Sequence, residues 1–439
     1  MKVNALPVDP GPAAWNDILA PRRPCPALDS TIQADVVVVG AGFAGLSAAQ
    51  RLQDLGVQRV VLLEAKALAE GPAGRNSGFM IDLPHELNSD GYTAKSGAQA
   101  REIRLNRLGI GYAAELAERY GLSRSAFHQG GRMTGAATEA GAKHLEQYAQ
   151  QLAAQNEPFT PVTGDQLQAI TGGDFYRQGL YTPGAAMIQP AEFVRGIAQG
   201  MVQAGVQLYE HTPVLEFSRT GNTWSLKTPQ GQVNAGQVIL AVNGHVQSFG
   251  HYPKRLLHVF TYASMTRALS DQELRVLGGQ DYWGMLPADP MGTTVRKDHR
   301  RIVIRNHATL NQNLQTTPGD MRRAARLQDK SLAARFPSLQ ARDFEYRWGG
   351  RLCLSINSVH AFGELETNLY SACCQNGLGT AKGMLSGLMA ADLVVQGSTP
   401  ELEEFQAGQS PKALVPDPFL SLGAKATLRY KEWRAGVEL

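Results

Sequence analysis

Residues 34–52 read ADVVVVGAGFAGLSAAQRL, and residues 59–64 read RVVLLE. The β-branched run 36–39 is typical of a strand that is buried on both faces of a parallel sheet. Residues 43–55 have helical periodicity, and Gly56 is placed to end that helix. The second apolar run completes a strand, helix, strand unit. We therefore predict an α/β fold in which regular structure begins at Asp35.

The turn between the first strand and its helix carries the pattern G-x-G-x-x-G. In such a turn the first glycine permits a tight bend, the second lets backbone N–H groups approach a pyrophosphate, and the third lets the helix pack against the strand. Glu64 ends the second strand, where a carboxylate accepts hydrogen bonds from ribose hydroxyls. The predicted contacts are Gly40, Gly42, Phe43, Ala44, Gly45, Glu64 and Ala65. This fingerprint alone does not distinguish NAD from FAD.

The composition is that of a globular protein with more than one domain. The chain has 439 residues, of which 43% are hydrophobic, and its formal charge of +3 does not indicate a nucleic-acid partner. No stretch approaches the ~18 to 20 apolar residues of a transmembrane helix, and the first residues lack the apolar core of a signal peptide. We therefore expect a cytoplasmic protein. The four cysteines have neither disulfide-framework nor zinc-site spacing, so no metal is expected.

Four later segments share a pattern with one known family. Residues 71–78 read GPAGRNSG, residues 235–245 read AGQVILAVNGH, residues 346–350 read YRWGG, and residues 369–380 read LYSACCQNGLGT. In this order after the fingerprint, they resemble the D-amino-acid oxidase-like (DAO) flavoproteins, which include glycine oxidase, sarcosine oxidase and glutamylputrescine oxidoreductase. Ser77 stands where the family more commonly has glycine.

The resemblance implies noncovalently bound FAD and a two-domain fold. A Rossmann-like FAD-binding domain of the GR2 type would be interleaved with an α+β substrate domain that carries a mixed or antiparallel sheet. The expected division is an N-terminal arm (1–34), an FAD-binding domain (35–97, 180–250 and 346–400), a substrate domain (98–179 and 251–345) and a C-terminal tail (401–439). Further cofactor contacts implied are Arg75, Asn76, Ser77, Gly78, Val214, Ala241, Gly377, Leu378, Gly379 and Thr380.

The resemblance also implies oxidation of the C–N bond of an amine or amino acid to an imine, by hydride transfer to the flavin. Oxygen or another acceptor would then reoxidise the flavin. The candidate catalytic residues are His85 and Asp82 near the amine, Arg296 as a carboxylate clamp, Trp348 as a wall, and Arg351 facing the ring. Each of them also has a structural explanation, such as an ion pair or core packing.

Two other functions remain open at this stage. The same fold would support oxidation of a 2-hydroxy acid, because hydride transfer does not distinguish the two substrates. The chain would alternatively be a flavin-binding subunit whose tail, 411–439, docks a partner subunit or a membrane surface. The simpler explanation is a tail wrapped on its own domain, and the sequence does not settle whether the chain forms a homo-oligomer.

Overall fold

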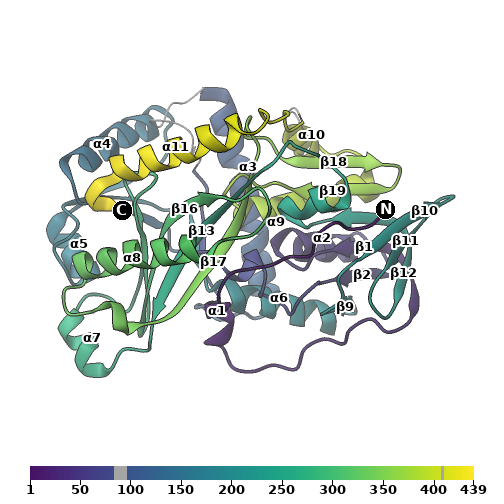
Figure 1. Cartoon of the computed structure of the whole chain (residues 1–439), viewed down its shortest axis with the longest axis horizontal. Helices are drawn as coiled ribbons and strands as arrows, with labels where there is room; N and C mark the ends of the chain where they lie inside the picture. Colours follow the sequence, from purple (N-terminus) through teal and green to yellow (C-terminus); the bar gives the residue numbers. More distant parts are fainter. Residues whose placement is uncertain (84–95, 407–409) are drawn as a thin grey trace.

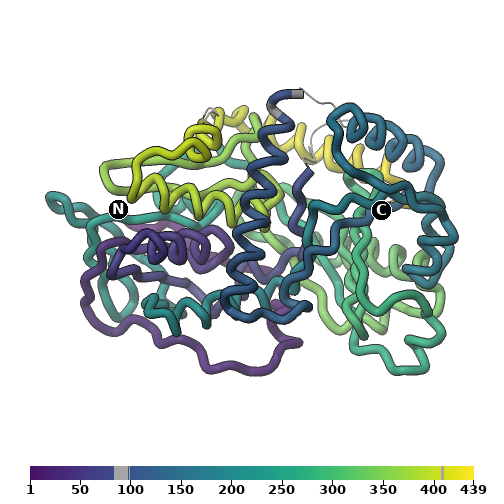
Figure 2. Tube along the Cα trace, turned by 180° about the vertical axis from the view of Figure 1, so that it is seen from behind, coloured from purple at the N-terminus to yellow at the C-terminus, as the bar shows by residue number. Residues whose placement is uncertain are grey.

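The structure, a computed structural model, describes residues 1–83, 96–406 and 410–439. Two large β-sheets lie side by side, each with helices packed against it (Figure 1). The first sheet carries the glycine-rich turn, and the second is built mainly from the middle of the chain. α3 (Ser96–Arg119) runs through the middle of the molecule when it is viewed from behind (Figure 2).

The first sheet is organised around β1 (Thr31–Val39), whose apolar end pairs in parallel with β12 (Gln232–Leu240) and β2 (Val60–Leu63). Val37 and Val38 are fully buried, as expected for a strand covered on both faces. The remaining strands of this sheet are β9 (Gln207–Tyr209), β10 (Glu216–Thr220), β11 (Thr223–Lys227), β18 (Ala361–Glu366) and β19 (Leu369–Cys373). The strand, helix, strand prediction is therefore confirmed.

Glycines let two helices pack closely on this sheet. α2 (Phe43–Asp54) lies against α9 (Ala381–Gln396), and a Cβ on Gly387 would lie 2.0 Å from the carbonyl oxygen of Ala44. A Cβ on Gly45 would lie only 1.7 Å from the carbonyl oxygen of Gly40, in the turn itself. α6 (Pro190–Gln203) and α3 complete this layer.

The second sheet is mixed, with mostly antiparallel pairs. Its order is β17 (Phe344–Leu354), β13 (Leu257–Thr266), β16 (Arg301–Leu310), β15 (Thr294–Asp298), β14 (Tyr282–Pro287), β5 (Arg132–Ala136), β7 (Gln178–Thr182) and β6 (Thr160–Thr163). α8 (Pro318–Arg335) packs on one face, where Ile302 and Ile304 meet Leu332. α4 (Glu139–Ala154), α5 (Gly164–Thr171) and α7 (Asp271–Leu277) complete this half. A small sheet joins β3 (Phe79–Met80), β8 (Ala186–Ile188) and β4 (Phe127–His128).

The structure differs from the expected division in two places. β17 pairs along its length with β13, so it belongs to the second sheet and not to the FAD-binding half. α3 packs against α9 and α6, so it covers the FAD-binding half although its residues were assigned to the substrate domain. Both differences arise from contacts between distant segments, which local periodicity does not reveal.

The two ends of the chain are fastened to the body. The N-terminal arm is irregular except for α1 (Ala14–Asp17), and Trp15 within it is fully buried. The tail forms α10 (Pro400–Gln406) and α11 (Phe419–Ala435), and the buried Glu438 carboxylate accepts a hydrogen bond from the backbone N–H of Ala137 (3.0 Å). The outward face of α11 exposes Phe419, Leu422, Tyr430 and Trp433. None of the described helices combines the length and the apolar character needed to cross a bilayer.

Candidate active site

The glycine-rich turn is held by the carboxylate that was predicted to bind ribose. Gly40 has φ of 101°, a conformation that favours glycine, and Gly42 precedes the first turn of α2. Glu64 accepts hydrogen bonds from the backbone N–H groups of Ala41 (2.9 Å) and Lys66 (3.0 Å). Burial raises the pKa of Glu64, although these two N–H groups oppose the effect.

The loop after β2 is ordered by its own side chains. Asn76 donates to the carbonyl of Ala73 (2.7 Å) and accepts from the N–H of Gly78 (2.8 Å). Gly78 has φ of 84°, and a Cβ there would lie 2.3 Å from the carbonyl oxygen of Ile188. The side chain of Arg75 turns toward the N-terminal arm, where it donates to the carbonyls of Pro10 and Gly11 (both 3.0 Å). This loop therefore presents its backbone, together with Asn76 and Ser77, to the cavity described next.

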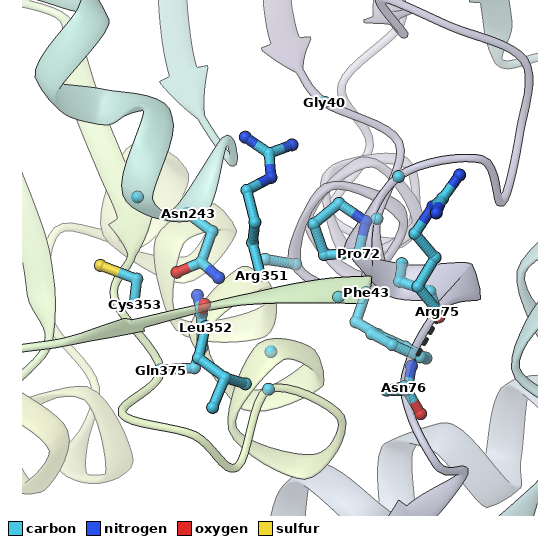
Figure 3. A pocket seen from close by; sticks show the side chains of 18 of the residues that line it. Gly40, Phe43, Pro72, Arg75, Asn76, Asn243, Arg351, Leu352, Cys353 and Gln375 are labelled. Carbon is cyan, nitrogen blue, oxygen red and sulfur yellow. Dashed lines mark hydrogen bonds between the residues drawn. The ribbon is translucent and has the colours of Figure 1, made fainter. Parts of the chain in front are cut away.

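One continuous cavity joins the two halves of the molecule (Figure 3). It is lined by the glycine turn, by the loop 71–77, by the start of α9 and by strands of the second sheet. The predicted cofactor residues that line it are Gly40, Gly42, Phe43, Ala44, Glu64, Ala65, Arg75, Asn76, Ser77, Val214, Ala241, Gly377, Leu378, Gly379 and Thr380. Gly45 and Gly78 lie outside the lining, and both are needed as glycines for close backbone packing.

The start of α9 gives the cavity a second helix N-terminus. Gly377 has φ of 85°, and no side chain of the described residues caps the first turn of the helix. The hydroxyl of Thr380 donates to the carbonyl of Phe79 (2.7 Å), which joins this turn to the loop on the other side. Free backbone N–H groups at such a position favour negative charge. Lys382, in the first turn of α9, binds Glu102.

An N-terminal strap, residues 1–12, closes one side of the cavity. Val3, Ala5, Leu6 and Pro7 line it, and backbone hydrogen bonds tie the strap to the first sheet and to β17. The carboxylate of Asp9 is fully buried and binds Lys66 Nζ (3.0 Å) and Arg351 Nε (3.0 Å). Burial alone would raise the pKa of Asp9, but the positive charges of Arg351, Lys66 and Arg75 outweigh it and lower that pKa.

Arg351 is the one predicted catalytic residue that the structure places in the lining, among the residues described. Figure 3 shows it extending from its strand into the space between Asn243 and Pro72. Its guanidinium binds Asp9 and the ring of His245. Burial, followed by the charge of Arg351, lowers the pKa of His245 to about 3, so this histidine is neutral at physiological pH.

The other catalytic predictions are placed elsewhere. Asp82 is buried and binds the guanidinium of Arg107 (2.9 Å). Arg296 is 1% exposed, donates to the Tyr282 hydroxyl (3.1 Å) and lies over the ring of Trp15 (4.8 Å). Trp348 is buried in the core and donates to the carbonyl of Arg75 (2.9 Å). His85 lies outside the described residues.

Arg305 is one of the cavity residues that sequence reasoning missed. The strand register places Ala263, Arg305 and Thr294 in one row across β13, β16 and β15, and all three line the cavity. No hydrogen bond or ion pair reaches Arg305 from the described residues, and burial alone lowers its pKa. A guanidinium stays charged in proteins, so Arg305 provides the cavity with a positive charge that would attract an anion. The available signal in the sequence was a cation placed directly after the apolar run 302–304.

These features fit FAD. The cavity extends from Glu64 and Val214, past the glycine turn, to Gly377 at the start of α9, so it accommodates an elongated dinucleotide. Two helix N-termini face the cavity, and Glu64 is fixed where a ribose would lie. The fold and the cavity together define a dinucleotide-binding protein.

Comparison with known proteins agrees with this conclusion. The profile of the family described as "DAO: FAD dependent oxidoreductase" matches residues 35–393, and the chain belongs to this family. It is 26% identical over 381 residues to the probable oxidoreductase OrdL of Haemophilus influenzae, covering 84% of this chain and 85% of that protein. It is 25% identical to gamma-glutamylputrescine oxidoreductase of Escherichia coli, covering 84% and 86%. The fold is similar to that of glycine oxidase from Geobacillus kaustophilus, with a TM-score of 0.69, 20% identity, and coverage of 88% and 100%.

Proposed function

We propose that this chain oxidises the C–N bond of an amino acid, or of an amine that carries a carboxylate, to an imine that water hydrolyses. Bound FAD supplies the hydride acceptor and passes the electrons to oxygen or another acceptor. The residues proposed to hold it are the cavity-lining members of the glycine turn, the loop 71–77 and the start of α9. The names of two relatives, a gamma-glutamylputrescine oxidoreductase and a glycine oxidase, support a nitrogen-containing substrate.

Arg305 carries the proposal. Its guanidinium opens into the cavity on the side of the second sheet and has no anionic partner among the described residues. A planar guanidinium binds a carboxylate through two parallel hydrogen bonds, which fix the orientation of the bound molecule as well as its position. Arg305 would therefore hold the carboxylate and leave the adjacent C–H bond directed at the flavin.

The absence of a strong base near Arg305, among the residues described, favours an amine over a 2-hydroxy acid. A hydroxyl must lose its proton during oxidation, whereas an amine enters the reaction as its neutral free base. Among the described residues that line the cavity, Glu64 is the only carboxylate, and it is held in the turn. Burial lowers the pKa of His245 to about 3 and that of His258 to about 4, so both rings are weak bases.

We also propose that FAD is held without a covalent bond. Cys353 lines the cavity, but a hydrogen bond with Cys374, together with burial, raises the pKa of its thiol. Burial raises the pKa of Cys373 to about 12. A protonated thiol is a poor nucleophile, so neither Cys353 nor Cys373 is suited to attack the flavin.

Replacing Arg305 with methionine tests the proposal. The change removes charge-assisted hydrogen bonds worth about 1.5–3 kcal/mol, so we expect KM for a carboxylate-bearing amine to rise about 10- to 150-fold. FAD content and the flavin spectrum should not change. The measurement is anaerobic flavin reduction in a stopped-flow instrument, as a function of substrate concentration.

Arg301→Met is the matched control, because Arg301 lies on the same strand and pairs with Glu345 at the surface. This variant should have the wild-type KM for the substrate, and its flavin should be reduced at the wild-type rate. Equal KM values for Arg305→Met and the wild type would contradict the proposed role of Arg305.

A further inference from the structure

A second arginine opens into the same cavity. Arg132, at the start of β5, is 5% exposed and lines the cavity together with Thr134 of the same strand. One of its terminal nitrogens donates to the hydroxyl of Tyr148 (2.6 Å), and its Nε has no hydrogen-bond partner among the described residues. Its side chain is therefore buried, charged and incompletely paired.

No carboxylate of the described residues forms an ion pair with Arg132. Asp82, on the neighbouring loop, binds Arg107 instead. Burying a guanidinium against neutral groups alone is costly, because its loss of hydration is not compensated. Like Arg305, Arg132 is therefore a charged side chain that lines the cavity without an ion-pair partner among the described residues.

The strand register separates the two arginines. Arg305 pairs with Thr294 across β16 and β15, β15 pairs with β14, and Leu286 of β14 pairs with Thr134 of β5. Arg305 and Arg132 are therefore three strand spacings apart across the sheet, about 14 Å, and about 7 Å apart along it. These are separations of the backbone positions, so the two side chains enter the cavity from well-separated strands. Together they offer two positions at which an anionic group can be bound.

The surface between the two arginines is mainly apolar. Leu286 lies on the intervening strand β14, beside the hydroxyl-bearing Thr134 and Thr294 of its neighbours, and Ile81, Pro287 and Pro290 also line the cavity. Apolar walls favour methylene groups and disfavour a charged spacer.

We propose that the substrate carries two anionic groups: a carboxylate next to the oxidised C–N bond, bound by Arg305, and a second carboxylate, bound by Arg132 across an aliphatic spacer. This inference rests on the proposed function, since it assumes that Arg305 binds the carboxylate beside the reacting carbon. Arg132 then determines specificity, by distinguishing an acidic amino acid or acidic amine derivative from one that bears a single charge. It takes no part in hydride transfer.

Binding of unreactive carboxylates to the holoenzyme tests the inference. The probes are straight-chain dicarboxylates of about four to nine carbons and the monocarboxylates of matched length, measured by isothermal titration calorimetry. For the dicarboxylate that spans the two guanidinium groups, we expect an affinity about 10-fold or more above that of its monocarboxylate. Arg132→Met should remove this advantage, and Arg132→Lys should restore part of it.

The outcomes separate the two proposals. Suppose that monocarboxylates bind, that Arg305→Met weakens their binding, and that no dicarboxylate binds more tightly than its matched monocarboxylate. The second anionic site is then wrong, while the proposed function stands. If no carboxylate binds the wild type, the proposed function itself fails. If the Arg132→Met variant does not retain FAD, the wild-type affinities still test the inference. Dicarboxylates that bind no more tightly than monocarboxylates at every chain length would overturn it.

Discussion

Replacing Gly45 with alanine is expected to yield a protein that does not retain FAD. The added Cβ would lie 1.7 Å from the carbonyl oxygen of Gly40, which is backbone and cannot move without displacing the turn. α2 would have to shift away from β1, at a cost of about 3 kcal/mol or more. Because the same turn presents its N–H groups to the cavity, the shift would also disrupt the cofactor site. Flavin absorbance per protein after gel filtration measures the loss.

Gly111→Ala is the matched control for this prediction. Gly111 also lies inside a helix, but a Cβ added there would meet no neighbouring atom of the described residues within 4 Å. Alanine is preferred over glycine in a helix interior, so this variant should retain FAD and gain up to about 1 kcal/mol in its free energy of unfolding. Full FAD content in Gly45→Ala would show that the turn does not have the close approach described.

Replacing Asp9 with asparagine is expected to release the N-terminal strap and accelerate the loss of FAD. Asp9 is fully buried between Lys66 and Arg351, so the change leaves two cations without their counter-charge. Removing one partner of a buried ion pair typically costs about 3–5 kcal/mol. Since Val3, Ala5, Leu6 and Pro7 line the cavity, a released strap would open it to solvent. The rise of free flavin fluorescence after dilution gives the rate of loss.

Asp35→Asn provides the comparison, because Asp35 pairs with Arg59 at the exposed edge of the same half of the molecule. Surface ion pairs contribute little, so this variant should release FAD at the wild-type rate. An Asp9→Asn enzyme that is as slow to release FAD as the wild type would mean that the strap does not retain the cofactor.

Local patterns in the sequence predict several residues that the structure places in the lining of the cavity. Gly40, Gly42 and Glu64 were predicted from their spacing along one strand, helix, strand unit, which is visible in the sequence, and all three line the cavity. The loop 71–78 and the start of α9 were found through resemblance to a family whose profile matches the chain. Each of these segments is short and continuous.

The substrate half depends on contacts that no local pattern contains. Arg296 and Arg305 both lie on strands of the second sheet. The structure is needed to show that the guanidinium of Arg296 packs on the ring of Trp15, whereas Arg305 lines the cavity. Asp82 was predicted to meet a substrate, but its partner, Arg107, is contributed by a distant helix. The strap was described only as an irregular arm, because ion pairs between distant residues hold Asp9 in place.

We expect the protein to oxidise an amine whose carboxylate is bound by Arg305. The most direct measurement is anaerobic titration of the wild-type holoenzyme with amino acids, with the corresponding carboxamides, and with 2-hydroxy acids of the same carbon skeleton. We predict that one or more amino acids bleach the flavin absorbance, and that the matching carboxamide does so at least 10-fold less effectively. Equal reduction by the amino acid and its carboxamide, or reduction by 2-hydroxy acids alone, would contradict the claim.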